Sequence, residues 1–122
     1  MAAKVLVVED EPSIADLIGM MLASQGYDVV TRNNATDALL ELAKGASFHA
    51  IITDYGLPEM DGRDFIETMR KRGLRVPTVL VTGRGDLTFD EVSAMGVAAV
   101  IIKPFLRKEL LSAVDHALSI RA

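Results

Sequence analysis

The sequence is 122 residues long and half hydrophobic, which suits one compact domain with a single core. Its 17 acidic and 13 basic residues give a net charge of −4 with no block of like charge, which argues against a free-standing nucleic-acid-binding protein. It contains no cysteine, which excludes disulfides, thiol nucleophiles and thiolate metal sites.

The sequence also disfavours a membrane or secreted protein. No apolar run approaches the roughly 18 residues that a membrane-spanning helix needs. The first predicted strand begins at Lys4, so the N-terminus leaves no room for a signal peptide. We therefore expect one cytoplasmic domain over residues 1–122 with no membrane partner and no direct nucleic-acid partner.

The first half of the chain alternates predicted strands and helices. Lys4–Val8 is apolar and β-branched, which indicates a buried strand, and three acids follow it before Pro12, which suits the first position of a helix. Apolar residues at helical spacing run from Ile14 to Leu22, and Gly26 ends this segment. The next elements are a strand at Tyr27–Thr31, a helix capped by Asn33 or Asn34 with Ala35, Ala38, Leu39 and Leu42 on its apolar face, and a strand at Ala50–Thr53.

The second half continues the alternation. Gly56, Pro58 and Gly62 mark a loop directly after the third strand. The later elements are a helix marked by Phe65, Ile66 and Met69, a strand at Thr78–Val81, a weakly indicated helix over Leu87–Met95, a strand at Ala98–Ile102 and a helix from Leu106 to Leu118. Five successive strand–helix units favour a parallel sheet that helices cover on both faces.

Chemically active side chains follow four of the five predicted strands. Glu9 and Asp10 follow the first strand, Asp54 the third, Thr82 the fourth and Lys103 the fifth. In an open parallel sheet these positions share one edge, where ligands usually bind. Converging carboxylates repel one another unless a cation joins them, and Mg²⁺ prefers such oxygen ligands. Asp54 is then a candidate nucleophile, because a carboxylate can form an aspartyl phosphate.

Each of these residues also has a simpler interpretation. Acids after a strand often cap the next helix or turn, which would explain Glu9, Asp10 and Asp54. Thr82 could be a turn residue and Lys103 a solvated surface lysine. Short motifs taken singly have a high false-positive rate. Their coincidence at four strand ends of one α/β pattern favours the functional interpretation.

The motifs together resemble the receiver domain of response regulators, the CheY-like family. The matching segments are Val7-Val8-Glu9-Asp10-Glu11-Pro12, Asp54-Tyr55-Gly56-Leu57-Pro58-Glu59-Met60-Asp61-Gly62, Val81-Thr82-Gly83 and Lys103-Pro104-Phe105. The resemblance extends from about Lys4 to Leu118. It implies a doubly wound five-stranded sheet in the order 2-1-3-4-5 with helices on both faces.

The resemblance also implies a mechanism. Asp54 would accept a phosphoryl group from a histidine kinase or a phosphotransfer protein. Asp10, Asp54 and the backbone carbonyl of Gly56 would bind Mg²⁺, with Glu9 acting through water. Thr82 and Lys103 would contact the phosphoryl group, and the Lys103–Pro104 peptide bond would be cis.

Two positions depart from the family pattern. Glu9 stands where the family usually has aspartate, so its geometry toward the metal is less defined. Val100 stands where an aromatic residue is common, and we interpret it as a packed strand residue. A switch in this chain would then depend on movement of Thr82, of the Gly83–Asp86 loop and of the fourth helix.

The resemblance further predicts partner surfaces. The kinase would dock on Ser13, Ile14, Leu17 and Pro104. The fourth helix, fifth strand and fifth helix would form the face that contacts a downstream protein or a fused output domain. The domain would be a switch and not an enzyme, beyond catalysing its own phosphoryl transfer and slow autodephosphorylation.

Two other functions remain open from the sequence. One is a Mg²⁺-dependent phosphatase or phosphotransferase with an aspartyl nucleophile. It would need an acid two residues after Asp54, where this chain has Gly56. The other is an unphosphorylated protein-interaction module in which the acids only cap helices.

Overall fold

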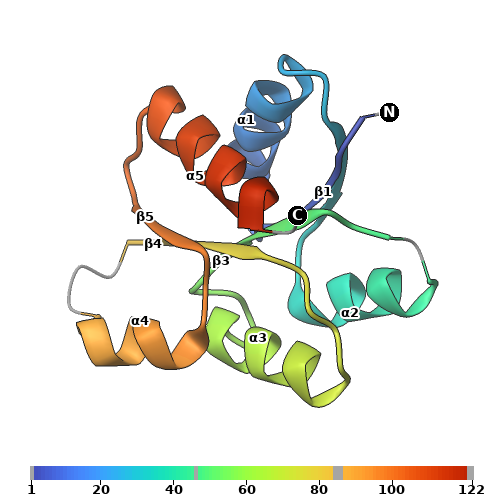
Figure 1. Cartoon of the computed structure of the whole chain (residues 1–122), viewed down its shortest axis with the longest axis vertical. Coiled ribbons are helices and arrows are strands. Elements are labelled where there is room, and N and C mark those ends of the chain that lie inside the picture. Colours follow the sequence, from blue (N-terminus) through green and yellow to red (C-terminus); the bar gives the residue numbers. More distant parts are fainter. Residues whose placement is uncertain (1, 46, 84–86, 121–122) are drawn as a thin grey trace.

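One parallel sheet with helices on both faces forms the domain, which we describe from a computed structural model of residues 2–45, 47–83 and 87–120 (Figure 1). The strand order is β2-β1-β3-β4-β5 and all neighbours are parallel, which confirms the fold expected from the sequence. The elements in chain order are β1 (Lys4–Val8), α1 (Pro12–Ala23), β2 (Asp28–Arg32), α2 (Ala35–Ala43), β3 (Ala50–Asp54), α3 (Gly62–Lys71), β4 (Thr78–Thr82), α4 (Phe89–Met95), β5 (Ala99–Ile102) and α5 (Arg107–Ile120).

The sheet separates two hydrophobic cores. Successive side chains of a strand point to opposite faces, so Val5 and Val7 pack with α1 and α5, whereas Leu6 and Val8 pack with α2 and α3. The three central strands are almost completely buried, which explains why their sequences are continuous apolar runs. In Figure 1, α1 and α5 lie on one face of the sheet and α2, α3 and α4 on the other.

Short polar residues fix where the helices begin. The Asn34 side chain accepts a hydrogen bond from the Asp37 backbone N–H at 2.7 Å, so Asn34 is the cap of α2. Asp61 caps α3 and Thr88 caps α4 in the same way. Pro12 occupies the start of α1, as predicted, and the preceding Glu11 makes no side-chain cap.

Several boundaries differ from the sequence prediction by one or two residues. The third and fourth strands extend to Asp54 and Thr82, the fifth strand begins at Ala99, and the last helix is Arg107–Ile120. The second strand is Asp28–Arg32, one residue later than expected. The Tyr27 N–H donates a hydrogen bond to the Leu22 carbonyl, so Tyr27 belongs to the turn that follows α1. The fourth helix begins at Phe89, not at Leu87, because Thr88 is its cap. The middle of the expected Gly83–Asp86 loop, residues 84–86, lies outside the described residues.

The strand register aligns the carboxyl ends. Val8 lies opposite Thr53, which places the acids after β1 beside Asp54. Thr82 lies opposite Ile102, which places Lys103 directly beyond the end of β4. None of the helices within the described ranges is long and apolar enough to span a lipid bilayer.

Candidate phosphoacceptor site

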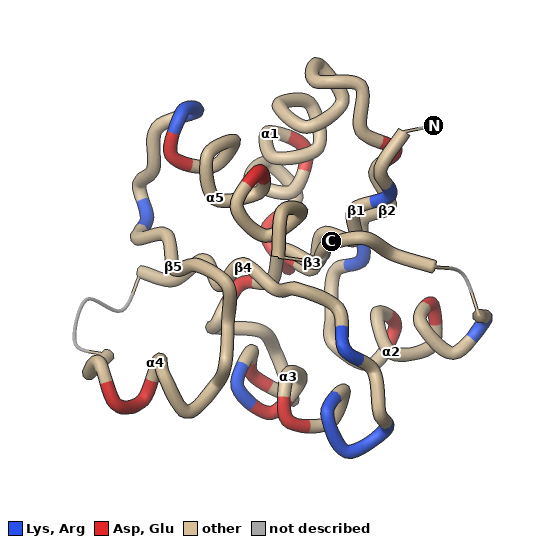
Figure 2. The backbone as a smooth tube through the Cα atoms, in the orientation of Figure 1, with Lys and Arg blue, Asp and Glu red and all other residues tan. Residues whose placement is uncertain are grey.

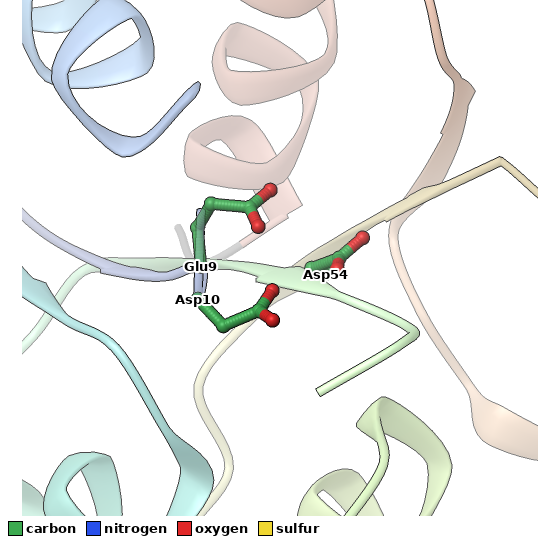
Figure 3. Close-up of side chains that lie close together, drawn as sticks. All are labelled: Glu9, Asp10 and Asp54. Carbon is green, nitrogen blue, oxygen red and sulfur yellow. The ribbon is translucent and has the colours of Figure 1, made fainter. Parts of the chain in front are cut away.

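Three carboxylates meet at the edge where β1 and β3 end. Each of Glu9, Asp10 and Asp54 contributes an oxygen, and these oxygens all lie within 4.8 Å of one another (Figure 3). Glu9 and Asp54 are buried, at 2% and 7% exposure, and Asp10 is exposed. The predicted convergence of the two strand ends is therefore present in the fold.

Asp54 is the last residue of β3, and the following loop is packed tightly around it. The Gly62 N–H donates to the Tyr55 carbonyl at 2.7 Å, which brings the start of α3 against the strand end. A Cβ atom at Gly62 would lie 2.7 Å from the Asp54 carbonyl oxygen, so only glycine fits there. Gly56 lies next to the side-chain carboxylate, and a Cβ atom there would be 3.9 Å from Asp54 Oδ2. The Oδ2 atom therefore faces a residue without a side chain.

Lys103 joins two of the three acids. Its Nζ lies 3.0 Å from Glu9 Oε1 and 3.1 Å from Asp54 Oδ1. The remaining Glu9 oxygen, Oε2, accepts the Glu11 N–H at 3.1 Å, so both oxygens of this buried carboxylate have partners. The Lys103–Pro104 peptide bond is cis, as the resemblance implied.

The pKa values of the ion pair reflect burial. Burial raises the pKa of Glu9 above its ordinary value, although hydrogen bonds from Lys103 and from the Glu11 backbone oppose that shift. Burial acts to lower the pKa of Lys103, but its hydrogen bonds to Glu9 and Asp54 outweigh burial, and the net pKa is raised. Lys103 therefore stays protonated at neutral pH and neutralises part of the acidic cluster.

The donor set suits a hard divalent cation. Mg²⁺ takes carboxylate and carbonyl oxygens and keeps several waters, and the exposed Asp10 leaves one side of the cluster open to solvent. Gly56, whose carbonyl was predicted as a ligand, is exposed and lies next to the Asp54 carboxylate. The residues present therefore fit a magnesium ion.

Thr82 and Val100 lie where the sequence analysis expected them. Thr82 is the last residue of β4 and is only 1% exposed, and its backbone carbonyl accepts the Lys103 N–H at 2.8 Å. Val100 lies in β5, half-buried against the core that contains Leu80 and Met95. The interpretation of Val100 as a packed strand residue is confirmed.

The predicted kinase-docking residues are accessible. Ser13 and Pro104 are exposed, Ile14 is half-buried, and Leu17 is 44% exposed on α1. In Figure 1, α1 lies beside α5, and Arg107 Nη2 contacts Ser24 Oγ between them at 2.7 Å. Their role in docking a kinase stays a prediction.

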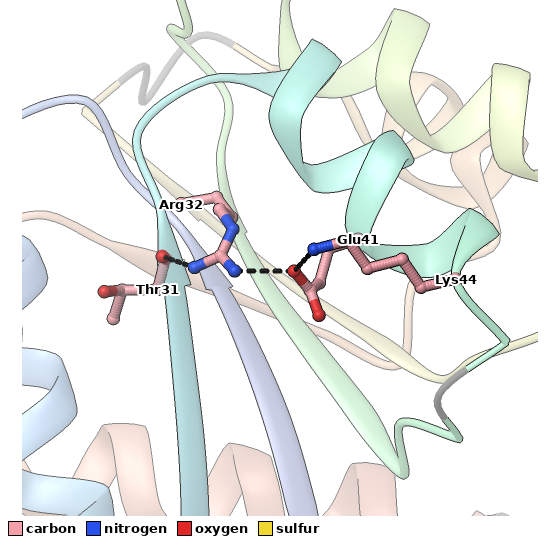
Figure 4. A network of polar contacts seen from close by, with 4 residues as sticks. All are labelled: Thr31, Arg32, Glu41 and Lys44. Atoms are coloured by element: carbon pink, nitrogen blue, oxygen red, sulfur yellow. Dashed lines mark hydrogen bonds and ion pairs between the residues drawn. The ribbon is translucent and has the colours of Figure 1, made fainter.

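One feature near the site was missed from the sequence. Glu41 on α2 is buried and accepts from Arg32 at 2.5 Å and from Lys44 at 3.4 Å (Figure 4). The hydrogen bond from Arg32 holds the pKa of Glu41 below its ordinary value. The Arg32 carbonyl in turn accepts the Glu9 N–H at 3.0 Å, so this network supports the strand end next to the acids. The sequence contains one signal for this: Glu41 lies three residues after Ala38, and this helical spacing places it beside the apolar face of α2.

Known proteins share both the sequence pattern and the fold. Residues 5–115 match the family described as the response regulator receiver domain. The response regulator protein FleR of Pseudomonas aeruginosa is 36% identical, over 97% of this chain and 25% of FleR. The uncharacterized transcriptional regulatory protein YkoG of Bacillus subtilis is 32% identical, over 93% of this chain and 50% of YkoG. The chain thus spans between a quarter and a half of the length of these two relatives.

Solved structures agree with the sequence matches. The chemotaxis response regulator CheY4 of Vibrio cholerae superposes with a TM-score of 0.87 at 30% identity, covering 97% of this chain and all of CheY4. A response regulator receiver domain protein from Clostridium thermocellum has the same TM-score at 29% identity, covering 98% of this chain and 96% of that protein.

Proposed function

The chain belongs to the response regulator receiver domain family of two-component signalling, and we propose that it is a phosphorylation switch whose phosphoacceptor is Asp54. The observation that carries the proposal is the geometry around this residue. Asp54 ends a central strand among two further acids and one lysine, with its Oδ1 held by Lys103 and its Oδ2 beside Gly56. The family and the fold are established, and the roles of the individual residues are our proposal.

The transfer step follows from this arrangement. An Asp54 oxygen attacks the phosphorus of a phosphohistidine, the bond between phosphorus and the imidazole nitrogen breaks, and an aspartyl phosphate forms. Lys103 is already within ion-pair distance of Asp54, so it stabilises negative charge on the phosphoryl oxygens without a large movement. Thr82 is the last residue of β4, and its hydroxyl could hydrogen-bond a phosphoryl oxygen.

Magnesium binding is part of the same proposal. Asp10, Asp54 and the Gly56 carbonyl would hold the ion, and Glu9 would contact it through water. The bound ion would supply positive charge to the phosphoryl oxygens. Glu9 has a second role in this chain, because its carboxylate positions the Lys103 ammonium beside Asp54.

The partners follow from the family. We expect a histidine kinase or a phosphotransfer protein to dock at Ser13, Ile14, Leu17 and Pro104. The face formed by α4, β5 and α5 would contact a downstream protein or a fused output domain. Related proteins described as transcriptional regulators support an output of this kind. A cytoplasmic location, where such kinases phosphorylate their regulators, belongs to the same proposal.

Amide NMR with and without beryllofluoride, which mimics the phosphoryl group on Asp54, tests the switch. Large shifts should spread from Thr82 through α4 to Met95 and should reach Val100. An Asp54→Ala variant is the control and should show none of these shifts. Shifts confined to Glu9, Asp10 and Asp54 would mean that the domain binds phosphate without switching, and the proposal would be wrong.

A further inference from the structure

Two arginines on one side of α3 contact α4. Arg70 donates from Nη1 to the Ala94 carbonyl at 3.1 Å and from Nη2 to the Met95 carbonyl. Arg63, two helical turns earlier, pairs with Glu91 at an Nη2–Oε2 distance of 3.3 Å. Figure 2 shows the basic residues of α3 and the acidic residues of α4 on these neighbouring helices.

These contacts hold both ends of a short helix. Ala94 and Met95 are the last residues of α4, and the carbonyls of a helix C-terminus have no partner within the helix. A guanidinium is well placed there, because it donates hydrogen bonds and complements the negative end of the helix dipole. Glu91 lies in the first turn of α4, so Arg63 holds the opposite end.

Apolar packing between the two helices is limited. A hollow of about 540 Å³ opens between them, and its lining residues include Ile66, Met95 and both arginines. Within the described chain, α3 is the helix against which α4 packs most closely. Phe89 at the start of α4 is 84% exposed and adds little burial. Met95 is buried in the core and Val92 packs against that core, so the arginine contacts add a polar attachment of α4 to this apolar one.

The other end of α3 is fixed to the phosphoacceptor strand. Gly62, its first residue, donates to the Tyr55 carbonyl and leaves no space for a Cβ atom against the Asp54 carbonyl. Helix α3 therefore connects the backbone of Asp54 directly to the two arginines.

We propose that Arg63 and Arg70 form a latch that holds α4 in its unphosphorylated position and sets how readily phosphorylation of Asp54 moves it. This inference rests on the proposed function. A phosphoryl mimic that favours a displaced α4 must overcome the latch, so removing the latch raises the apparent affinity for the mimic.

Two measurements on an Arg63→Gln/Arg70→Gln double variant test the latch. Without ligand, amide hydrogens of α4 should exchange about tenfold faster than in the wild type, which corresponds to losing roughly one charge-assisted hydrogen bond. In a beryllofluoride titration followed by NMR, the midpoint should fall by about threefold or more. The α4 signals of the free variant should also move toward their ligand-bound positions.

The matched control for each arginine is Lys71→Gln, which removes one positive charge from the same helix. Lys71 pairs only with Glu67 of α3, at 3.4 Å, among the contacts of the described residues, so both measurements should stay at the wild-type values. If the double variant loses the amide signals of the sheet, the single variants Arg70→Gln and Glu91→Gln carry the same test. Unchanged exchange and an unchanged midpoint in folded variants would overturn the latch. Failure of the wild type to bind beryllofluoride would refute the proposed function instead, and hydrogen exchange in the free protein would still decide whether the arginines hold α4.

Discussion

Replacing Lys103 by glutamine should destabilise the metal-free protein. The change removes the ammonium that lies 3.0 Å from Glu9 and 3.1 Å from Asp54. It leaves two buried carboxylates next to Asp10 without a cation, and charges that lose their buried partner are costly. Glutamine keeps a hydrogen-bond donor and most of the side-chain volume, so the effect reports mainly on charge.

The expected loss follows from the geometry. Two charge-assisted hydrogen bonds are worth about 1.5–3 kcal/mol each, but the Lys103 side chain is 23% exposed and Glu9 can relieve the repulsion by taking a proton. We therefore expect a loss of about 2–3 kcal/mol in the free energy of unfolding. For a protein of this size, that lowers the urea midpoint by roughly 1 M or more.

Urea unfolding followed by circular dichroism at pH 7 measures this loss, first in a chelator and then with saturating Mg²⁺. Mg²⁺ should stabilise the variant more than the wild type, because the acids of the variant have no other cation. The exposed control Lys71→Gln should lose less than about 0.5 kcal/mol. If Lys103→Gln also lost less than about 0.5 kcal/mol in the chelator, our claim that Lys103 stabilises the acidic cluster would be refuted.

Four further predictions follow from other parts of the molecule. Saturating Mg²⁺ should raise the melting temperature of the wild type by mass action, and Asp10→Asn should abolish most of that shift in thermal melts. Ile14→Ala should slow phosphoryl transfer from a histidine kinase while labelling by acetyl phosphate stays intact, whereas equal loss with both donors would mean a damaged fold. Gly62→Ala should cost about 1–3 kcal/mol in urea unfolding, because its Cβ atom would overlap the Asp54 carbonyl; Gly19→Ala, with contacts no closer than 4.0 Å, should not destabilise. The pKa of Glu41 in the folded protein lies below its ordinary value of 4.5, so its ion pairs stabilise the fold fully above about pH 4.5 and less at lower pH. The difference in the free energy of unfolding between Glu41→Gln and the wild type should therefore shrink as the pH falls below about 4.5.

The fold was predictable from the sequence because its signals are local. Buried parallel strands contain continuous apolar runs, such as residues 5–8 of β1, and glycines or short polar residues mark the helix ends. The boundaries that moved depend on which backbone and side-chain groups form hydrogen bonds at the ends of the elements. Tyr27 was expected in the second strand, but its N–H donates a hydrogen bond to the Leu22 carbonyl near the end of α1.

The site was predictable at the level of residue types but not of contacts. Parallel strands bring Glu9, Asp54 and Lys103 to one edge, and this follows from topology alone. Which carboxylate oxygen pairs with Lys103 depends on side-chain conformation, which the sequence does not encode locally. The contacts of Arg70 with α4 were missed for a similar reason. A basic residue near a helix end already complements its own helix, and only the packing shows that its guanidinium reaches a neighbouring one.

The most direct test of the central claim is to locate the phosphoryl group. The protein is incubated with acetyl phosphate and Mg²⁺, its intact mass is measured, and borohydride reduction before peptide mapping identifies the modified residue. Our account predicts one phosphoryl group, at Asp54, that requires Mg²⁺ and is absent from Asp54→Asn. No gain in mass, or a phosphoryl group on another residue such as His49 or His116, would contradict it.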